Sequence, residues 1–269
     1  MSGLDRLRLV LARPFLRYLT RAGISRGKGF IMRRVLPAIL PQPPASFSLA
    51  RPGGTTVQLH YGEVLGIAAL VHGGFEDAEC RRMLELAIPG TTAIDVGANV
   101  GIHTIPLARR LAPGTVIAIE PLEANAERLQ ANAALNALAN VDLHVVAAGS
   151  SLGLVDLHLA NDGAFVSTGH VVEHRAAGSL ITVSQTTLDG LWESAGHPAV
   201  SLIKIDVEGE EVGVMLGAEE LLSKARPAIV AEASTPEALN DVSLALARHG
   251  YRRVAAEGFE PWNHLFLAT

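Results

Sequence analysis

The stretch TTAIDVGANVGIHTIPLA, residues 91–108, decides the fold. Its apolar residues from Ala93 to Val96 predict a short strand, the turn GANVG follows, and the apolar residues from Ile102 onward predict a helix. A strand, a glycine turn and a helix in this order are typical of the first unit of a doubly wound parallel sheet. Gly97 and Gly101 let the backbone approach a ligand closely, and the helix start directs free N–H groups into the same crevice.

The residues around this turn favour S-adenosylmethionine (SAM) over a dinucleotide. Asn99 stands where the dinucleotide motif GxGxxG has its second glycine, and the phosphate loop GxxxxGK[ST] does not occur. Asp95 ends the strand, where a carboxylate would repel a pyrophosphate but suits a ligand with an amino group and a sulfonium. Glu120 ends the next strand, 19 residues after Gly101, where an acid accepts hydrogen bonds from ribose hydroxyls. The alternative is a tight turn that binds no ligand.

Composition limits the number of domains, the kinds of partner and the cysteine chemistry of the chain. The 269 residues, 49% of them hydrophobic, suffice for one large α/β domain with an extension. The net charge of −5 is uneven, because residues 1–45 hold nine Lys and Arg against one acid, whereas the rest holds 13 against 26. A basic arm on an acidic body argues against nucleic-acid binding by the body. Cys80 is the only cysteine, which excludes an intrachain disulfide and a cysteine-based zinc site and suits a reducing cytoplasm.

The basic arm, residues 1–45, is expected to precede a catalytic domain over residues 46–269. Arginines interrupt every apolar stretch that could form the core of a signal peptide. The sequence has no run of 18 apolar residues, the length that a membrane-spanning helix needs. Two interpretations of the arm stay open. It is either a helical cap or dimer contact on the catalytic body, or a reversible attachment to an anionic membrane surface or substrate.

Within the arm, Leu4, Leu7 and Leu11 share one face of a predicted helix that should end at Pro14. The elements expected after it are a short helix over 15–20, a basic turn over 23–29 and a proline-rich linker over 37–45.

The rest of the chain alternates strands and helices, which predicts one three-layer α/β/α sandwich. The elements expected in order are a hairpin over 46–60, a helix within 72–90, a helix over 123–138, a strand over 141–149, an outlying strand over 154–160, a mobile segment over 161–179 that covers the site, a strand and helix over 179–193, a strand over 201–205, a strand over 227–234, a helix over 235–249 and a closing hairpin.

Five acids gather at the carboxyl ends of the predicted strands, namely Asp95, Glu120, Asp206, Glu208 and Glu232. In open α/β sheets the ligand lies outside this edge. Methyl transfer to a hydroxyl needs an acceptor held in line and a base that takes the proton as the bond forms. Asp206 is the first candidate for that base, followed by Glu208 and Glu232. The alternative roles are holding a divalent cation, since hard cations prefer carboxylate oxygens, and purely structural ion pairs through Lys204 and Arg226.

One histidine pair has competing interpretations. His170-Val171-Val172-Glu173-His174 spells the zinc-protease pattern HxxEH, but the flanking glycines and small residues make a poor helix. A lid that contributes His170 or His174 to the acceptor pocket is favoured over a zinc hydrolase, and ordinary surface histidines are the alternative.

Four motifs, IDVGANVGIHT, VIAIEP with LQANAALN, LIKIDVEGEE and IVAEAS, resemble the FkbM family of SAM-dependent methyltransferases over residues 55–268. The lead-in Gly74-Phe75-Glu76 is similar too. The resemblance implies a class I, Rossmann-like sandwich with a seven-stranded sheet whose last strand is antiparallel, and O-methylation of sugars, polyketides or related metabolites. The predicted SAM-binding residues are Glu76, Asp95, Gly97, Ala98, Asn99, Gly101, Thr104, Glu120, Pro121, Ala148 and Asp206, and the predicted catalytic residues are Asp206, Glu208, Glu232 and His174.

The sequence therefore predicts a SAM-dependent O-methyltransferase whose partner is a small-molecule or glycan acceptor. Three rivals remain: N- or C-methylation at the same site, a non-catalytic SAM-binding module, and a nicotinamide oxidoreductase. Homo-oligomerisation and peripheral membrane contact through the arm are further expectations.

Overall fold

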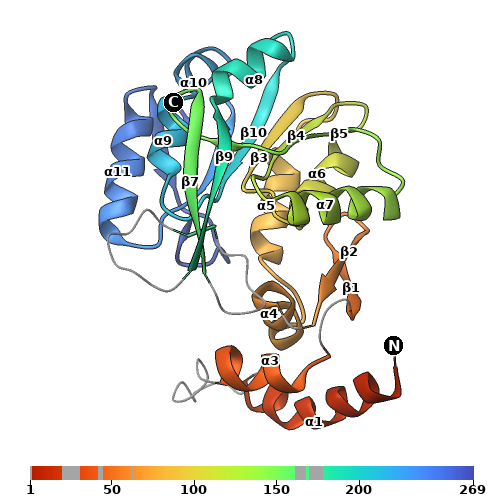
Figure 1. Ribbon diagram of the computed structural model, residues 1–269. Helices are drawn as coiled ribbons and strands as arrows, with labels where there is room; N and C mark the ends of the chain where they lie inside the picture. Colours follow the sequence, from red (N-terminus) through yellow and green to blue (C-terminus); the bar gives the residue numbers. More distant parts are fainter. Residues whose placement is uncertain (1, 20–30, 42–44, 62, 161–167, 170–177) are drawn as a thin grey trace.

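A seven-stranded sheet forms the centre of the computed structural model, which describes residues 2–19, 31–41, 45–61, 63–160, 168–169 and 178–269 (Figure 1). Its strand order is β12-β13-β11-β10-β3-β4-β5. Only β13 runs antiparallel to its neighbours, while the pairs from β11 to β5 are parallel. The predicted class I sandwich with an antiparallel last strand is thereby confirmed. The strands are β3 (Thr92–Val96), β4 (Val116–Ile119), β5 (Val141–His144), β10 (Val200–Ile205), β11 (Ala228–Glu232), β12 (Tyr251–Val254) and β13 (Asn263–Ala268).

Helices cover both faces of the sheet, which explains the continuous apolar runs of its central strands. Side chains alternate between faces: Ile94 and Val96 pack on one side, and Ala93 packs on the other. The first face is covered by α8 (Leu188–Ser194), α9 (Glu211–Leu216), α10 (Glu219–Lys224) and α11 (Pro236–Ala247). The second face is covered by α5 (Asp77–Leu86) and α6 (Thr104–Leu111), with α7 (Glu123–Leu135) beside them.

The glycine turn lies between β3 and α6 and passes directly over the end of β10. Gly97 has φ +80°, and a Cβ added there would lie 1.8 Å from the backbone oxygen of Asp206. Glycine is therefore required at this position both by its backbone conformation and by the close approach of the next strand. The turn and Asp206 are thus held together by backbone packing.

Replacing Gly97 with alanine is expected to lower the free energy of unfolding by about 1–3 kcal/mol, with a further loss from the steric contact. Gly196→Ala is the matched control, because Gly196 also has φ +80° but has open space around an added Cβ. Urea unfolding gives the loss of stability in each variant, and the difference between the two losses measures the effect of the steric contact at Gly97. Equal destabilisation would contradict a close approach between the turn and β10.

A second sheet, in the order β6-β9-β7-β8, shows that one strand boundary predicted from the sequence is wrong. The single strand expected over 141–149 is wrong: β5 ends at His144, and β6 (Ala147–Ala148) pairs with β9 (Gly178–Thr186) instead. An apolar run does not reveal where a chain changes its pairing partner. The outlying strand is confirmed as β7 (Gly153–Ala160), next to β8 (Thr168–Gly169). The expected mobile segment lies mostly outside the described residues.

The amino-terminal part forms a helical layer beneath the sheet (Figure 1). Its helix α1 (Gly3–Leu19) continues through Pro14, so the predicted end at this proline is wrong. Packing of Leu9, Ala12 and Leu16 on the neighbouring helices outweighs the hydrogen bond that Pro14 cannot make. The predicted linker over 37–45 is wrong at its start, because α3 (Leu36–Ile39) extends into it. The π-helix η1 (Ile31–Val35) comes directly before it. Among the described residues no helix is long and apolar enough to cross a bilayer.

A hairpin and a further helix join this layer to the sandwich. The hairpin is confirmed as β1 (Ser46–Arg51) and β2 (Thr55–His60), paired antiparallel. It is followed by α4 (Val64–His72), which sequence inspection missed. Ile67 and Val71 of α4 pack with Ala12 and Leu36 of the arm.

Candidate active site

A cavity of about 370 Å³ opens at the carboxyl ends of β3, β4, β10 and β11, within the size range of small-ligand sites. The glycine turn and the start of α4 both contribute to its walls. Its polar lining is dominated by carboxylates from four strand ends. The lining residues are Glu63, Val64, Leu65, Phe75, Glu76, Asp95, Gly97, Ala98, Asn99, Ile102, His103, Glu120, Asn125, Arg128, Lys204, Asp206, Glu208, Glu232 and Trp262.

Glu120, after β4, is anchored by backbone N–H groups. Its Oε2 accepts a hydrogen bond from the backbone N of Asn99 at 2.9 Å, and its Oε1 accepts one from the backbone N of Leu122 at 3.0 Å. The Nδ2 of Asn125 also donates to Oε1, at 3.3 Å. Burial raises the pKa of Glu120, and these donors oppose that rise. Oε1 already accepts two of these hydrogen bonds, so Oε2 has more acceptor capacity left for a further donor in the cavity.

Asp95, on β3, is almost fully buried behind the glycine turn. The Oγ1 of Thr104, at the start of α6, donates a hydrogen bond to its Oδ2 at 2.5 Å. Burial raises the pKa of Asp95, while the nearby His103, Thr104 and Lys204 work against the rise. Thr104 therefore orients the carboxylate that lines the cavity floor.

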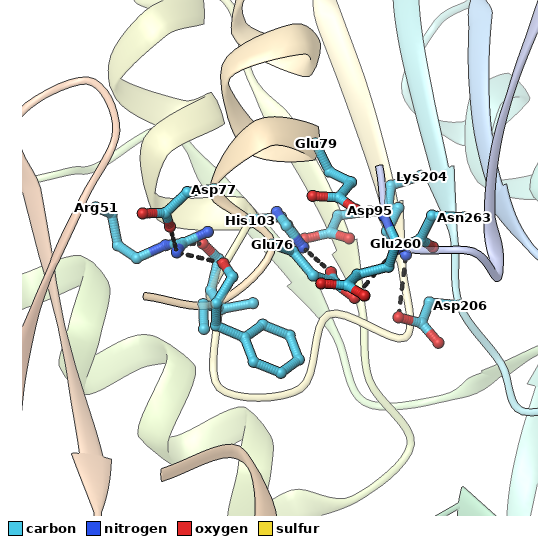
Figure 2. A network of polar contacts seen from close by, with 12 residues as sticks. Arg51, Glu76, Asp77, Glu79, Asp95, His103, Lys204, Asp206, Glu260 and Asn263 are labelled. Atoms are coloured by element: carbon cyan, nitrogen blue, oxygen red, sulfur yellow. Dashed lines mark hydrogen bonds and ion pairs between the residues drawn. The ribbon is translucent and has the colours of Figure 1, made fainter. Parts of the chain in front are cut away.

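Glu76 connects two walls of the cavity (Figure 2). Its Oε2 lies 2.8 Å from the Nε2 of His103, and its Oε1 accepts a hydrogen bond from the Nδ2 of Asn263 at 3.0 Å. Burial disfavours the charged imidazole, but the interactions with Cys80 and Glu76 outweigh it and raise the pKa of His103 to about 9. The pair is thus an ion pair at neutral pH. Glu76 also has φ +47°, an uncommon backbone conformation for a residue other than glycine.

Lys204, Asp206 and Glu232 form the second cluster. Lys204 is 1% exposed, and its Nζ donates to the Oδ2 of Asp206 at 3.0 Å (Figure 2). Burial opposes the charge on Lys204, but Asp206 and Glu76 raise its pKa above the ordinary value. Burial likewise opposes the charge on Asp206, yet Lys204 and a hydrogen bond with Glu232 lower its pKa to about 2.

The pKa values of Asp206 and Glu232 shift in opposite directions, which favours the proton of this cluster on Glu232. Burial raises the pKa of Glu232, as does its hydrogen bond to the charged Asp206. At neutral pH, Asp206 is therefore ionised and Glu232 donates a hydrogen bond to it. Two carboxyl groups with different protonation states, next to a buried ammonium group, are typical of sites that handle protons.

This arrangement predicts that stability falls as the pH rises. The folded-state pKa values of Glu232 and His103 are raised, so both groups hold protons in the folded state that the unfolded chain releases. Their contribution is complete below the unfolded pKa of each group and is lost as the pH rises through the folded one. The free energy of unfolding is expected to fall by about 2–4 kcal/mol between about pH 6 and pH 8.

The variant Glu232→Gln keeps a neutral donor and should flatten that dependence. Glu237→Gln, at an exposed position in the first turn of α11, is the matched control and should leave it unchanged. Urea unfolding at both pH values checks the difference. A slope in Glu232→Gln equal to that of the parent would show that Glu232 is not held protonated in the folded state.

The structure brings most predicted site residues to this cavity, while their roles stay predictions. Seven predicted cofactor residues line it: Glu76, Asp95, Gly97, Ala98, Asn99, Glu120 and Asp206. Asp206, Glu208 and Glu232 of the predicted catalytic set line it as well. Gly101, Thr104, Pro121 and Ala148 are outside the described lining: Thr104 supports Asp95, and Ala148 belongs to the second sheet. His170 and His174 fall outside the described residues.

Several lining residues were missed as site residues. The predicted ion pair of Lys204 with a strand-end carboxylate is confirmed, but its place in the cavity lining was not predicted. Arg226, predicted to form a similar ion pair, instead donates to the backbone oxygens of His249 and Thr269. A lysine in a buried apolar strand is a sequence signal for a nearby carboxylate. His103, Glu63 and Arg128 had no such signal, because they come from separate elements. Within the described residues no group of three His, Cys, Asp or Glu side chains is arranged to hold a metal ion.

Comparison with known proteins gives a family match. The family model for the methyltransferase FkbM domain matches residues 95–253, which span the glycine turn and the acids after β4, β10 and β11. No curated protein matches the chain in sequence.

Solved structures with a similar fold include several methyltransferases. Methyltransferase FkbM from Methylobacillus flagellatus KT has 14% identity and a TM-score of 0.45, over 97% of this chain and 60% of that one. TYW2 from M. jannaschii in complex with AdoMet has 16% identity and a TM-score of 0.45, over 86% of this chain and 90% of that one. A SAM-dependent O-methyltransferase from Thermotoga maritima has 14% identity and a TM-score of 0.45, over 73% of this chain and 66% of that one. The chain thus spans 60% of the length of the Methylobacillus protein.

Proposed function

This chain belongs to the FkbM methyltransferase family, and from that premise we propose that it is a SAM-dependent enzyme that methylates a hydroxyl group on a small molecule or glycan. The observation that carries the proposal is the set of carboxylates around one cavity. Glu120 and Asp95 line the part of the cavity beside the glycine turn, and Asp206 and Glu232 line the part beside β10 and β11. The first pair suits a cationic cofactor, and the second suits proton removal from an acceptor.

The residues beside the glycine turn fit SAM. Glu120 is fixed by two backbone N–H groups and presents oxygens to the cavity, as a partner for two ribose hydroxyls must. Asp95 and Glu76 supply carboxylates that would hold an amino group. Gly97 leaves no room for a side chain between the turn and β10, so the backbone itself borders the ligand.

The acceptor side is assigned from proton handling. When bound, SAM would supply a methyl group carried on a positively charged sulfur. That methyl group would pass to the acceptor oxygen as its bond to sulfur breaks. Asp206 is ionised and has a 32% exposed side chain in the cavity wall, so it can accept the hydroxyl proton as the new bond forms. Lys204 fixes one of its oxygens at 3.0 Å, and Glu232 donates to the same carboxylate. Alignment of the acceptor oxygen supplies much of the remaining rate.

A screen of hydroxylated metabolites and glycans with methyl-labelled SAM tests the proposal. The expected result is accumulation of S-adenosylhomocysteine (SAH) together with a methyl group that NMR locates on an oxygen. Asp206→Asn should slow formation of the labelled product by about 10²–10⁴-fold in the same screen. A methyl group on nitrogen or carbon would contradict O-methylation, and SAM binding without SAH formation from any acceptor would favour a non-catalytic binding module.

A further inference from the structure

An apolar stripe on α1 faces away from the protein. Leu4, Leu7 and Leu11 are 60%, 54% and 55% exposed, and the stripe is completed by the exposed Val10 and Phe15. Residues three and four apart share one face of a helix, so these side chains form one continuous surface along the helix. An exposed apolar surface of this kind marks an interaction site more often than a free surface.

The exposed stripe is distinct from the face that holds α1 on the protein. Ala12 is 0% exposed and Leu19 is 4% exposed, and both pack with Leu36 of α3 and Ile67 of α4. Helix α1 therefore has two apolar faces, of which one is already used in folding. The second has no such use among the described residues.

Basic side chains border the stripe on both sides. On a helical projection Arg6 and Arg13 adjoin it on the side of Val10, and Arg8 adjoins it on the side of Leu4 and Leu11. Arg6 and Arg13 are exposed, and Arg8 is half-buried. The whole arm, residues 1–45, carries nine Lys and Arg and a single acid, Asp5.

We propose that this face of α1 docks on the surface of an anionic lipid bilayer, with the leucines entering the interface and the arginines contacting acidic headgroups. A helix with leucines on one face and arginines at its borders has the chemistry of an interfacial membrane helix. Each basic residue near an anionic surface adds to the attraction. A second copy of the arm is disfavoured as the occupant, because it would bring two strongly positive segments together.

The location of the face connects it to the cavity. Helix α4 contacts the arm through Ile67 and Val71 and lines the cavity with Val64 and Leu65. The proposed membrane contact is therefore one helical layer away from the site. This inference concerns attachment alone and does not depend on the identity of the acceptor.

Flotation of the full chain with lipid vesicles tests the proposal. Vesicles of phosphatidylcholine with phosphatidylglycerol should bind the protein, whereas vesicles of phosphatidylcholine alone should bind it at least about tenfold more weakly. Leu7→Glu combined with Leu11→Glu should reduce binding by a further tenfold or more, since two exposed leucines are lost. Arg6→Glu with Arg13→Glu should reduce it to a similar extent, and salt should weaken binding by the parent protein.

Controls come from another exposed helix. Leu244→Glu and Arg248→Glu alter an exposed leucine and arginine at the end of α11 and should leave flotation unchanged. Equal binding by the α1 variants and the parent, or equal binding to neutral and anionic vesicles, would overturn the proposal. Analytical ultracentrifugation gives the remaining outcome: a parent dimer that the Leu7 and Leu11 changes convert to monomer would assign the face to a second copy instead.

Discussion

Replacing Asp206 with asparagine is expected to lower kcat by about 10²–10⁴-fold, while the affinity for SAM changes by less than about tenfold. Asparagine keeps the size of the side chain but cannot accept a proton from the acceptor. The ionised Asp206 is also the direct partner of the buried Lys204. Because removal of its charge lets Glu232 ionise instead, part of the local charge balance returns, but at a different place in the cavity.

The measurement is single-turnover methyl transfer with saturating SAM, beside calorimetric SAM affinity. Asp241→Asn, at an exposed position on α11, is the matched control and should keep both values. Thermal unfolding of each variant shows whether Asp206→Asn stays folded at the assay temperature, since it leaves a buried ammonium group without its partner. A folded Asp206→Asn enzyme with unchanged kcat would refute the catalytic role of Asp206.

Replacing Glu120 with alanine is expected to weaken SAM binding by about 10²–10⁴-fold. Two hydrogen bonds to a charged carboxylate contribute about 1.5–3 kcal/mol each when both partners are aligned. The alignment is already present, since the backbone N atoms of Asn99 and Leu122 hold the carboxylate at 2.9 and 3.0 Å. Asp95→Ala should weaken binding for a different reason, because it removes a buried negative charge near a cationic ligand.

A matched variant is Glu123→Ala, an exposed acid in the first turn of α7. Its SAM affinity should equal that of the parent, which separates the local contact from the effect of net charge. Titration calorimetry with SAH gives the affinities, and thermal unfolding confirms that each variant is folded. If Glu120→Ala and Asp95→Ala both keep the affinity of the parent, the cofactor lies elsewhere.

The carboxyl edge of the sheet could be predicted from the sequence for a simple physical reason. Parallel strands covered on both faces appear as short apolar runs, and their ends are marked by a change to glycine and acids, as at Gly97, Glu120 and Asp206. The strand ends of one sheet lie together, so listing those acids also brings them to one site. Five acids, predicted from strand ends alone, line the same cavity.

The parts that escaped prediction depend on contacts between distant segments. The chain leaves the central sheet after His144, although the apolar run goes on to Ala148. Helix α1 passes through Pro14 because Leu9, Ala12 and Leu16 pack on neighbouring helices on both sides of the proline. Helix propensity, which is a local property, does not include that packing. The protonation states of Asp206 and Glu232 likewise follow from burial and from Lys204 and not from any motif.

The most direct test of the whole account is a crystal structure with SAH bound. The ribose hydroxyls are expected within hydrogen-bond distance of Glu120, the amino group beside Asp95 or Glu76, and the sulfur facing Asp206 across the cavity. Density for SAH at any other place on the protein, or a ribose turned away from Glu120, would contradict it.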